Sequence, residues 1–159
     1  MTTGCDAPDH EHCITSALSR AEDLCRARGA RLTPLRRDIL RRVWASHDPV
    51  RAYDLIEAMN QAGQKTAPPT VYRSLDFLVQ HGLVHKLASI NAYMGCCEPE
   101  QPHRGCFLIC SHCQSAREIQ SDALERAMAQ ASREEGYDVS HATLEITGIC
   151  RACRDAATP

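Results

Sequence analysis

Apolar side chains recur at a helical spacing through most of the first half of the chain. Positions i, i+3 and i+4 share one face of a helix, so this spacing predicts four helices with one buried side each. A threonine caps free N–H groups, a proline in the first turn loses no needed donor, and a glycine suits the residue after the last turn. The predicted helices span residues 13–28, begin at Thr33-Pro34, run from Ala52 to Gly63, and run from Pro68-Pro69 to Gly82.

Two short strands are predicted after the fourth helix. Residues 83–87 and 92–94 hold strand-forming side chains, and Ser89-Ile90-Asn91 between them suits a turn. Helices followed by a hairpin is the order of a winged helix, which places one helix in the DNA major groove. An ordinary helical domain with the same order of elements is the alternative.

The second half of the chain has a different pattern. Residues 97–104 contain two prolines and several charged side chains, and they predict a linker. Strands are predicted over residues 106–109, 115–119 and 139–149, with a helix capped by Ser121 and ended by Gly136. The side chains expected to face inward from this helix are Leu124, Ala127, Met128 and Ala131. The fold class is therefore α+β: a helical domain with a hairpin, then a small α/β domain with a three-stranded sheet.

The small second domain is expected to need help to remain folded. A core from three strands and one helix, over roughly 55 residues, usually needs a metal, a partner subunit or both. We therefore expect dimerisation through this sheet.

Four of the ten cysteines form two Cys-x-x-Cys pairs, Cys110/Cys113 and Cys150/Cys153. Each pair presents two thiolates from one turn, and two pairs can close a tetrahedral site. Zinc fits this geometry, since it prefers thiolates and has no redox chemistry. The sequence thus predicts a structural zinc that joins segments 36 residues apart.

Other uses of these cysteines are less consistent with the chain. The N-terminal sequence has no basic start followed by an apolar run, and no stretch is long and apolar enough for a membrane span. We therefore expect a cytoplasmic protein in a reducing compartment, which favours metal over disulfides. A thioredoxin-like pair would need a βαβ context, which the residues around Cys110 do not show.

Basic residues are concentrated in the first half. The net charge is −2, but residues 26–51 contain eight arginines and two aspartates. Such a segment can face phosphates, or it can be a solvated helix face.

Specific motifs resemble those of the ferric uptake regulator superfamily. The segment TVYRSLDFLVQHGLVHK is followed by CSHC and CRAC, and a cysteine follows Asn-Ala-Tyr-Met-Gly. The resemblance is greatest to the zinc uptake regulator branch. It implies a dimeric, metal-responsive transcription repressor rather than an enzyme, with no small-molecule substrate. The expected parts are a flexible tail (1–12), a winged-helix DNA-binding domain (13–96), a hinge (97–104) and a dimerisation and zinc-binding domain (105–159).

The same resemblance implies a second, regulatory metal site at the hinge, and hence two zinc ions per monomer. Its implied ligands are His85, Cys96, His103 and Glu118. Two imidazoles, one thiolate and one carboxylate suit zinc. A shift of one residue would exchange Cys96 for Cys97. A sensor of iron, manganese or nickel, or of peroxide through thiols, is the alternative in this superfamily.

Several residues are candidates for contact with double-stranded DNA. Arg73 in the fourth helix could read a guanine edge, and Tyr72 beside it could contact phosphate or a thymine methyl. Tyr53 matches a DNA-contacting tyrosine of relatives. The expected phosphate contacts are Arg31, Arg36, Arg37 and Arg51. A dimer of winged helices predicts a pseudo-palindromic operator.

The remaining cysteines have no assigned site. Cys25 and Cys106 fall on apolar faces and are expected to be buried. Cys5, Cys13 and Cys97 have no predicted role. The run Asp9-His10-Glu11-His12-Cys13 could bind metal or form part of a disordered tail. A zinc hydrolase is disfavoured, since the chain has no His-Glu-x-x-His motif.

Overall fold

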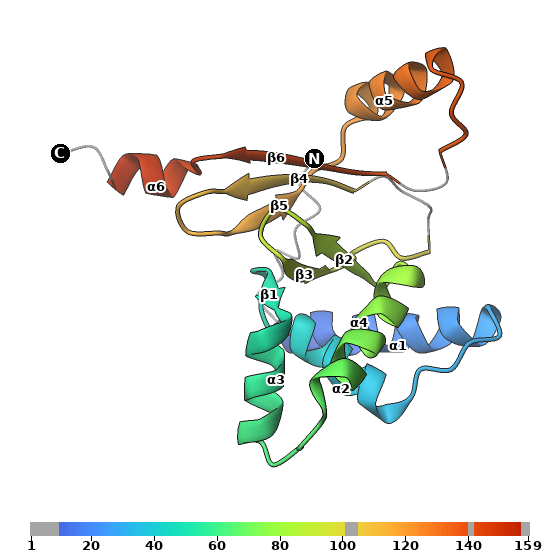
Figure 1. Cartoon of the computed structure of the whole chain (residues 1–159), viewed down its shortest axis with the longest axis vertical. Coiled ribbons are helices and arrows are strands. Elements are labelled where there is room, and N and C mark those ends of the chain that lie inside the picture. Colours follow the sequence, from blue (N-terminus) through green and yellow to red (C-terminus); the bar gives the residue numbers. More distant parts are fainter. Residues whose placement is uncertain (1–9, 101–104, 140–141, 157–159) are drawn as a thin grey trace. The chain divides into compact units, whose positions relative to one another are not determined.

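The structure is a computed structural model, and it describes residues 10–100, 105–139 and 142–156. The described residues divide into two compact units, 10–100 and the remainder. Each unit has its own sheet (Figure 1).

Four helices of the first unit confirm the helical predictions. They are α1 (His10–Ala27), α2 (Pro34–Val43), α3 (Ala52–Gln61) and α4 (Pro68–Gln80). The Thr33 hydroxyl accepts a hydrogen bond from the Arg36 N–H at 3.4 Å and so caps α2. Gly82 follows α4 with φ 68°, a conformation that glycine adopts without strain.

Helix α1 begins earlier than predicted, at His10 within the expected tail. Glu11 lies in its first turn, where a negative charge interacts favourably with the helix dipole. The Thr15 hydroxyl donates to the Glu11 carbonyl at 2.9 Å. The helix thus begins before the apolar stripe that defined its predicted start.

Three antiparallel strands form the wing of the first unit. They are β1 (Val50–Arg51), β2 (Val84–Leu87) and β3 (Ala92–Gly95), in the order β1-β3-β2. The predicted hairpin is β2–β3, and Asn91 occupies its turn with φ 49°. Strand β1 was not predicted, because two residues after a proline are too few to show a period.

The helices and the wing share one core. Its members include Leu18, Ile39, Leu40, Leu75 and Tyr93, all nearly inaccessible to solvent. The ring of Trp44, at the end of α2, lies against Gly95 of β3. A Cβ added at Gly95 would lie 2.4 Å from the Trp44 ring, so this close approach requires glycine.

The second unit contains the predicted three-stranded sheet. Its elements are β4 (Gly105–Cys110), β5 (Ala116–Glu118), α5 (Asp122–Glu134), β6 (Thr143–Gly148) and α6 (Arg151–Ala156). The strand order is β5-β4-β6, with β5 antiparallel and β6 parallel to β4. Strand β6 is shorter than the predicted 139–149. Helix α6 was predicted only as a cysteine turn.

The predicted inward face of α5 is wrong for Ala127 and Ala131, which are exposed. Ser121 caps α5 as expected, accepting from the Leu124 N–H at 3.4 Å. Leu124 and Met128 are half-buried, and no residue of α5 is fully buried. The sequence pattern identifies an apolar side of a helix but not what covers it.

Within the described ranges, no helix has the length and apolar character needed to cross a bilayer.

Candidate metal centre and nucleic-acid interface

Parallel pairing of β4 and β6 places the two Cys-x-x-Cys pairs at the same end of the sheet. Cys110, the last residue of β4, is in register with Gly148, the last residue of β6. The Ser111 N–H donates to the Gly148 carbonyl at 2.8 Å and joins the two turns that follow. Segments that lie far apart in the sequence therefore meet where the neighbouring strands β4 and β6 end.

Each pair is held by a tight turn of backbone. The Gln114 N–H donates to the Cys110 carbonyl at 2.9 Å, and Gln114 takes a φ of 60°. The Arg154 N–H donates to the Cys150 carbonyl at 3.0 Å, so Cys150 and Cys153 bracket the first turn of α6. Both turns bring their two cysteines onto one side.

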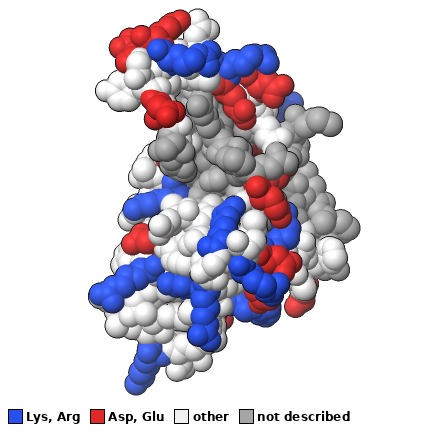
Figure 2. Space-filling view, turned by 90° about the vertical axis from the view of Figure 1, so that its right-hand side faces the viewer, with Lys and Arg blue, Asp and Glu red and all other residues white. Residues whose placement is uncertain are grey.

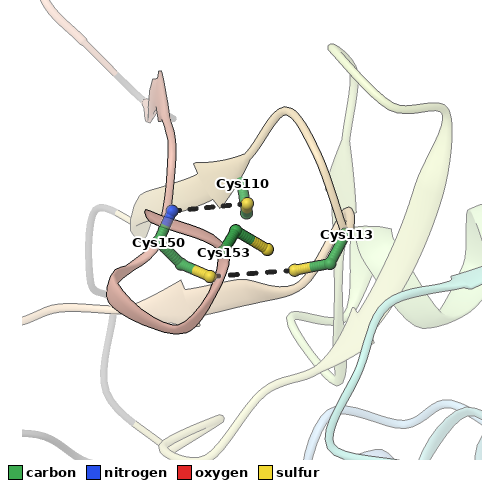
Figure 3. A group of neighbouring side chains, drawn as sticks. All are labelled: Cys110, Cys113, Cys150 and Cys153. Atoms are coloured by element: carbon green, nitrogen blue, oxygen red, sulfur yellow. Dashed lines mark hydrogen bonds between the residues drawn. The ribbon is translucent and has the colours of Figure 1, made fainter. Parts of the chain in front are cut away.

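The four sulfur atoms converge (Figure 3). All lie within 4.8 Å of one another, and the Cys113 and Cys150 sulfurs are 3.9 Å apart. A tetrahedron with Zn–S bonds of about 2.3 Å has edges of roughly 3.8 Å, so the sulfurs fit a zinc ion. Among the residues that the structure describes, this is the one cluster of three or more metal-ligand side chains.

Hydrogen bonds prepare part of this cluster for metal binding. Backbone donors, first of all the Cys150 N–H at 3.4 Å, lower the pKa of Cys110 to about 5. The Ser115 hydroxyl, 3.1 Å from the Cys113 sulfur, lowers the pKa of Cys113. The Cys150 side chain and the other nearby sulfurs raise the pKa of Cys153 to about 12. Thiolate is the ligating form, so a cation here would relieve the crowding of negative charge.

Sequence reasoning missed Ser111 and Ser115. Neither lies in a pattern that distinguishes it from an ordinary loop serine.

The strand register separates Cys96 from Cys97. His85 pairs with Met94, and the Cys96 N–H donates to the Leu83 carbonyl at 3.1 Å, which continues the ladder by one residue. Residues two apart on a strand share a face, so Cys96 and His85 lie diagonally on the same face of the hairpin. Cys97 instead packs against the helical core.

The other two predicted hinge ligands are Glu118 and His103. Glu118 is a buried residue of β5 in the second unit, paired with Phe107 of β4. His103 lies outside the described residues. A buried carboxylate usually has a cation or hydrogen-bond donors as partners. A metal cation is one such partner, so the burial of Glu118 is compatible with a role as a metal ligand.

Two predictions about the remaining cysteines are confirmed. Cys25 and Cys106 are both buried. Burial raises the pKa of each thiol, and Glu118 raises that of Cys106 further.

Exposed aromatic and basic side chains occur on the first unit. Tyr53 of α3 is 70% exposed and Tyr72 of α4 is 44% exposed. Arg73 of α4 and Arg31 before α2 are exposed too. Figure 2 shows that Lys and Arg side chains outnumber acidic ones over the helices of the first unit on the face drawn. This combination suits DNA phosphates and base edges.

Two of the predicted phosphate contacts, Arg36 and Arg37, also have partners within the fold. The Arg36 guanidinium lies 3.6 Å from the centroid of the Phe77 ring and donates to the Arg31 carbonyl at 2.8 Å. Arg37 pairs with Glu22 at 2.6 Å. Arg51 is exposed at the start of α3, where its side chain makes no cap hydrogen bond.

A sequence model of the ferric uptake regulator family matches residues 27–147, which is most of the chain. The chain belongs to the ferric uptake regulator family. It is similar to the zinc uptake regulation protein of Escherichia coli K12, with 37% identity over 137 residues, covering 86% of this chain and 80% of that protein.

Solved structures of zinc uptake regulators resemble the fold. One, complexed with zinc and DNA, has a TM-score of 0.84 and 35% identity, and covers 92% of this chain and 98% of its own. The crystal structure of holo XcZur has a TM-score of 0.77 and 39% identity, with 88% and 98% covered. The predicted family, its zinc uptake regulator branch and the α+β winged-helix fold class are confirmed.

Proposed function

We propose that the protein is a zinc-responsive transcription repressor that binds double-stranded DNA as a homodimer. The observation that carries the proposal is the convergence of four cysteine sulfurs in a chain whose relatives are zinc uptake regulators. One of those relatives was solved with zinc and DNA together. Its targets would be zinc-uptake genes, under a pseudo-palindromic operator.

The structural zinc would be held by Cys110, Cys113, Cys150 and Cys153. A bound zinc supplies a closed, redox-inert link between the end of β4 and the start of α6. The second unit has few fully buried side chains and none in α5. This link therefore supports a unit that its own core stabilises weakly.

The regulatory zinc, the second per monomer, would be held by His85, Cys96, His103 and Glu118. The shared face of His85 and Cys96 supports this set, and it favours Cys96 over Cys97. These ligands come from both units. A metal held by all four would therefore restrict the motion of one unit relative to the other. It shifts the DNA-binding equilibrium only as far as it prefers one arrangement over the other.

For DNA, the exposed face of α4 would enter the major groove. Arg73 would read a base edge, with Tyr72 and Tyr53 beside it, and Arg31 and Arg51 would contact phosphates. Arg36 and Arg37 are assigned a smaller share, because their guanidinium groups already bind Phe77 and Glu22.

Dimerisation would use the second unit. Leu108 of β4 and Ile146 of β6 are in register on the same face and are 43% and 40% exposed. An apolar pair on an exposed sheet face is typical of a surface that a partner covers. Helix α5, with its exposed alanines, extends the apolar surface available to a second copy.

The test is DNA binding as a function of free zinc. A labelled duplex is first selected from a random pool by the wild-type protein with zinc, and its anisotropy is then followed. We expect tight binding that weakens when free zinc is chelated, and a shift to higher zinc in Cys96→Ser. Binding that responds to iron or manganese but not to zinc would contradict the proposal.

A further inference from the structure

Two arginines, Arg20 of α1 and Arg28 just after α1, hold the chain segment that follows Cys96. The Arg20 Nη1 donates to the Cys97 carbonyl at 2.8 Å and lies 3.9 Å from the Glu100 carboxylate. The Arg28 Nη2 donates to the Pro99 carbonyl at 3.3 Å. Residues 97–100, predicted as a linker, are therefore attached to the first unit.

Arg28 also holds the end of α4. Its Nη1 donates to the carbonyl of His81, the residue after α4, at 2.7 Å. The carbonyls at a helix C-terminus lack intrahelical donors and carry partial negative charge, so a guanidinium there is favourable. The Arg28 side chain thus joins residues 97–100 to the end of α4, the helix that carries Arg73.

The geometry of arginine suits this double contact. The planar guanidinium presents several N–H donors in a fixed fork, whereas a lysine offers a single charged nitrogen. Nearby contacts keep the end of α4 in place: the His81 and Phe77 rings are 4.2 Å apart, and Arg36 covers Phe77. A shift of the Pro99 carbonyl would therefore disturb Arg28, which also donates to the carbonyl at the end of α4.

We propose that Arg20 and Arg28 are positioning residues that couple the hinge site to α4. They fix the backbone next to Cys96, and Arg28 transmits the position of that backbone to the C-terminal end of α4. This inference rests on the proposed regulatory zinc, because it names the path by which the ligand segment acts on the DNA-reading helix. The physical requirement is that Arg28 makes both contacts in one of the two states only.

The test measures the ratio of DNA dissociation constants without and with regulatory zinc. The probe is a duplex selected from a random pool by the zinc-loaded wild type, and mild chelation removes the regulatory metal. We expect Arg28→Ala to lower this ratio about tenfold, which corresponds to about 1.4 kcal/mol. Arg28→Lys should restore part of it, and Arg20→Ala should lower it as well.

Arg26→Ala is the matched control. Arg26 lies two residues before Arg28 and carries the same charge, but it forms an ion pair with Asp23 of α1 at 2.8 Å. The control variant should keep the wild-type ratio. The single tryptophan, Trp44 beside Gly95, gives a second readout, since zinc bound at Cys96 should change its emission.

Three outcomes would overturn the inference. An equal loss of affinity with and without zinc in Arg28→Ala would make Arg28 a direct phosphate contact. A lower melting temperature with an unchanged ratio would make it a purely structural residue. A wild-type ratio near one would remove the proposed zinc response itself, and the coupling with it.

Discussion

At the residue scale, the roles of arginines depend on contacts that charge counts do not show. Eight arginines in residues 26–51 predicted a phosphate-facing surface. The structure divides them, because Arg37 pairs with Glu22 and Arg36 covers Phe77, while Arg31 is exposed. Arg73, outside that run, lies on the exposed face of α4. Arg36 and Arg37 thus have partners within the fold, and their phosphate contacts stay predictions.

Arg73 and Arg31 should differ in how they contribute to DNA binding. Replacing a base-reading arginine by alanine costs about 1–3 kcal/mol on the specific site and relaxes sequence choice. Arg31→Ala should weaken all DNA about equally and reduce the salt slope by about one. Binding to selected and random duplexes over a range of salt concentrations distinguishes the two. An equal loss on both duplexes for Arg73→Ala would remove its base-reading role.

Gly95 should not tolerate a side chain. The added Cβ of Gly95→Ala would lie 2.4 Å from the Trp44 ring, and overpacking of this kind costs about 1–3 kcal/mol. Gly148→Ala is the control, because its Cβ would meet no atom within 4 Å. Urea unfolding gives the free energies of unfolding: Trp44 emission reports on the first unit, which holds Gly95, and circular dichroism also reports on the second unit, which holds Gly148. Equal stability of the two variants would show that the ring moves aside at no cost.

At the element scale, long and capped segments were predictable and short ones were not. Helices α2, α4 and α5 carry an apolar period together with Thr33, Pro68 or Ser121 at their starts. Strand β1 has two residues and α6 has six, too few for a period to appear. The cover of α5 depends on what packs against it, which a helical period does not encode.

The candidate sites show the same division. The Cys-x-x-Cys spacing alone predicted the four-cysteine cluster. The structure brings the two pairs together because each pair lies at the end of a strand, and the two strands are neighbours. The hinge ligands were predicted through the resemblance. The choice between Cys96 and Cys97 depends on the strand register, which a cysteine doublet in the sequence leaves open.

The folded structure of the second unit should depend on the four-cysteine zinc far more than the folded structure of the first unit does. Cys113→Ser is expected to lose the structural zinc and the ordered β4–β6 edge, while the core around Trp44 remains folded. Circular dichroism should show a partial loss of structure with unchanged Trp44 emission. His112→Ala, inside the same turn but outside the sulfur cluster, should keep its zinc. Global unfolding of Cys113→Ser would show instead that the two units fold as one.

At the scale of the whole molecule, the proposed hinge zinc would link the second unit, which we propose to dimerise, to the first unit, which we propose to read DNA. Moving a population from 1:99 to 99:1 takes about 5.5 kcal/mol of preference for one state. A hinge zinc can provide this only if its ligands come from both units. Because of that requirement, the proposed second zinc, with Cys96 as a ligand, is the part of the proposal to test first.

The most direct test is the zinc content per monomer, measured by elemental analysis before and after mild chelation. In the wild type we expect two zincs per monomer, falling to one after chelation. Cys97→Ser should behave like the wild type, because the Cys97 side chain packs on the core. Cys96→Ser should begin with one zinc and keep it. One zinc in all three proteins, with no other metal bound, would contradict the account: the four-cysteine site would remain, and the zinc-sensing hinge would not.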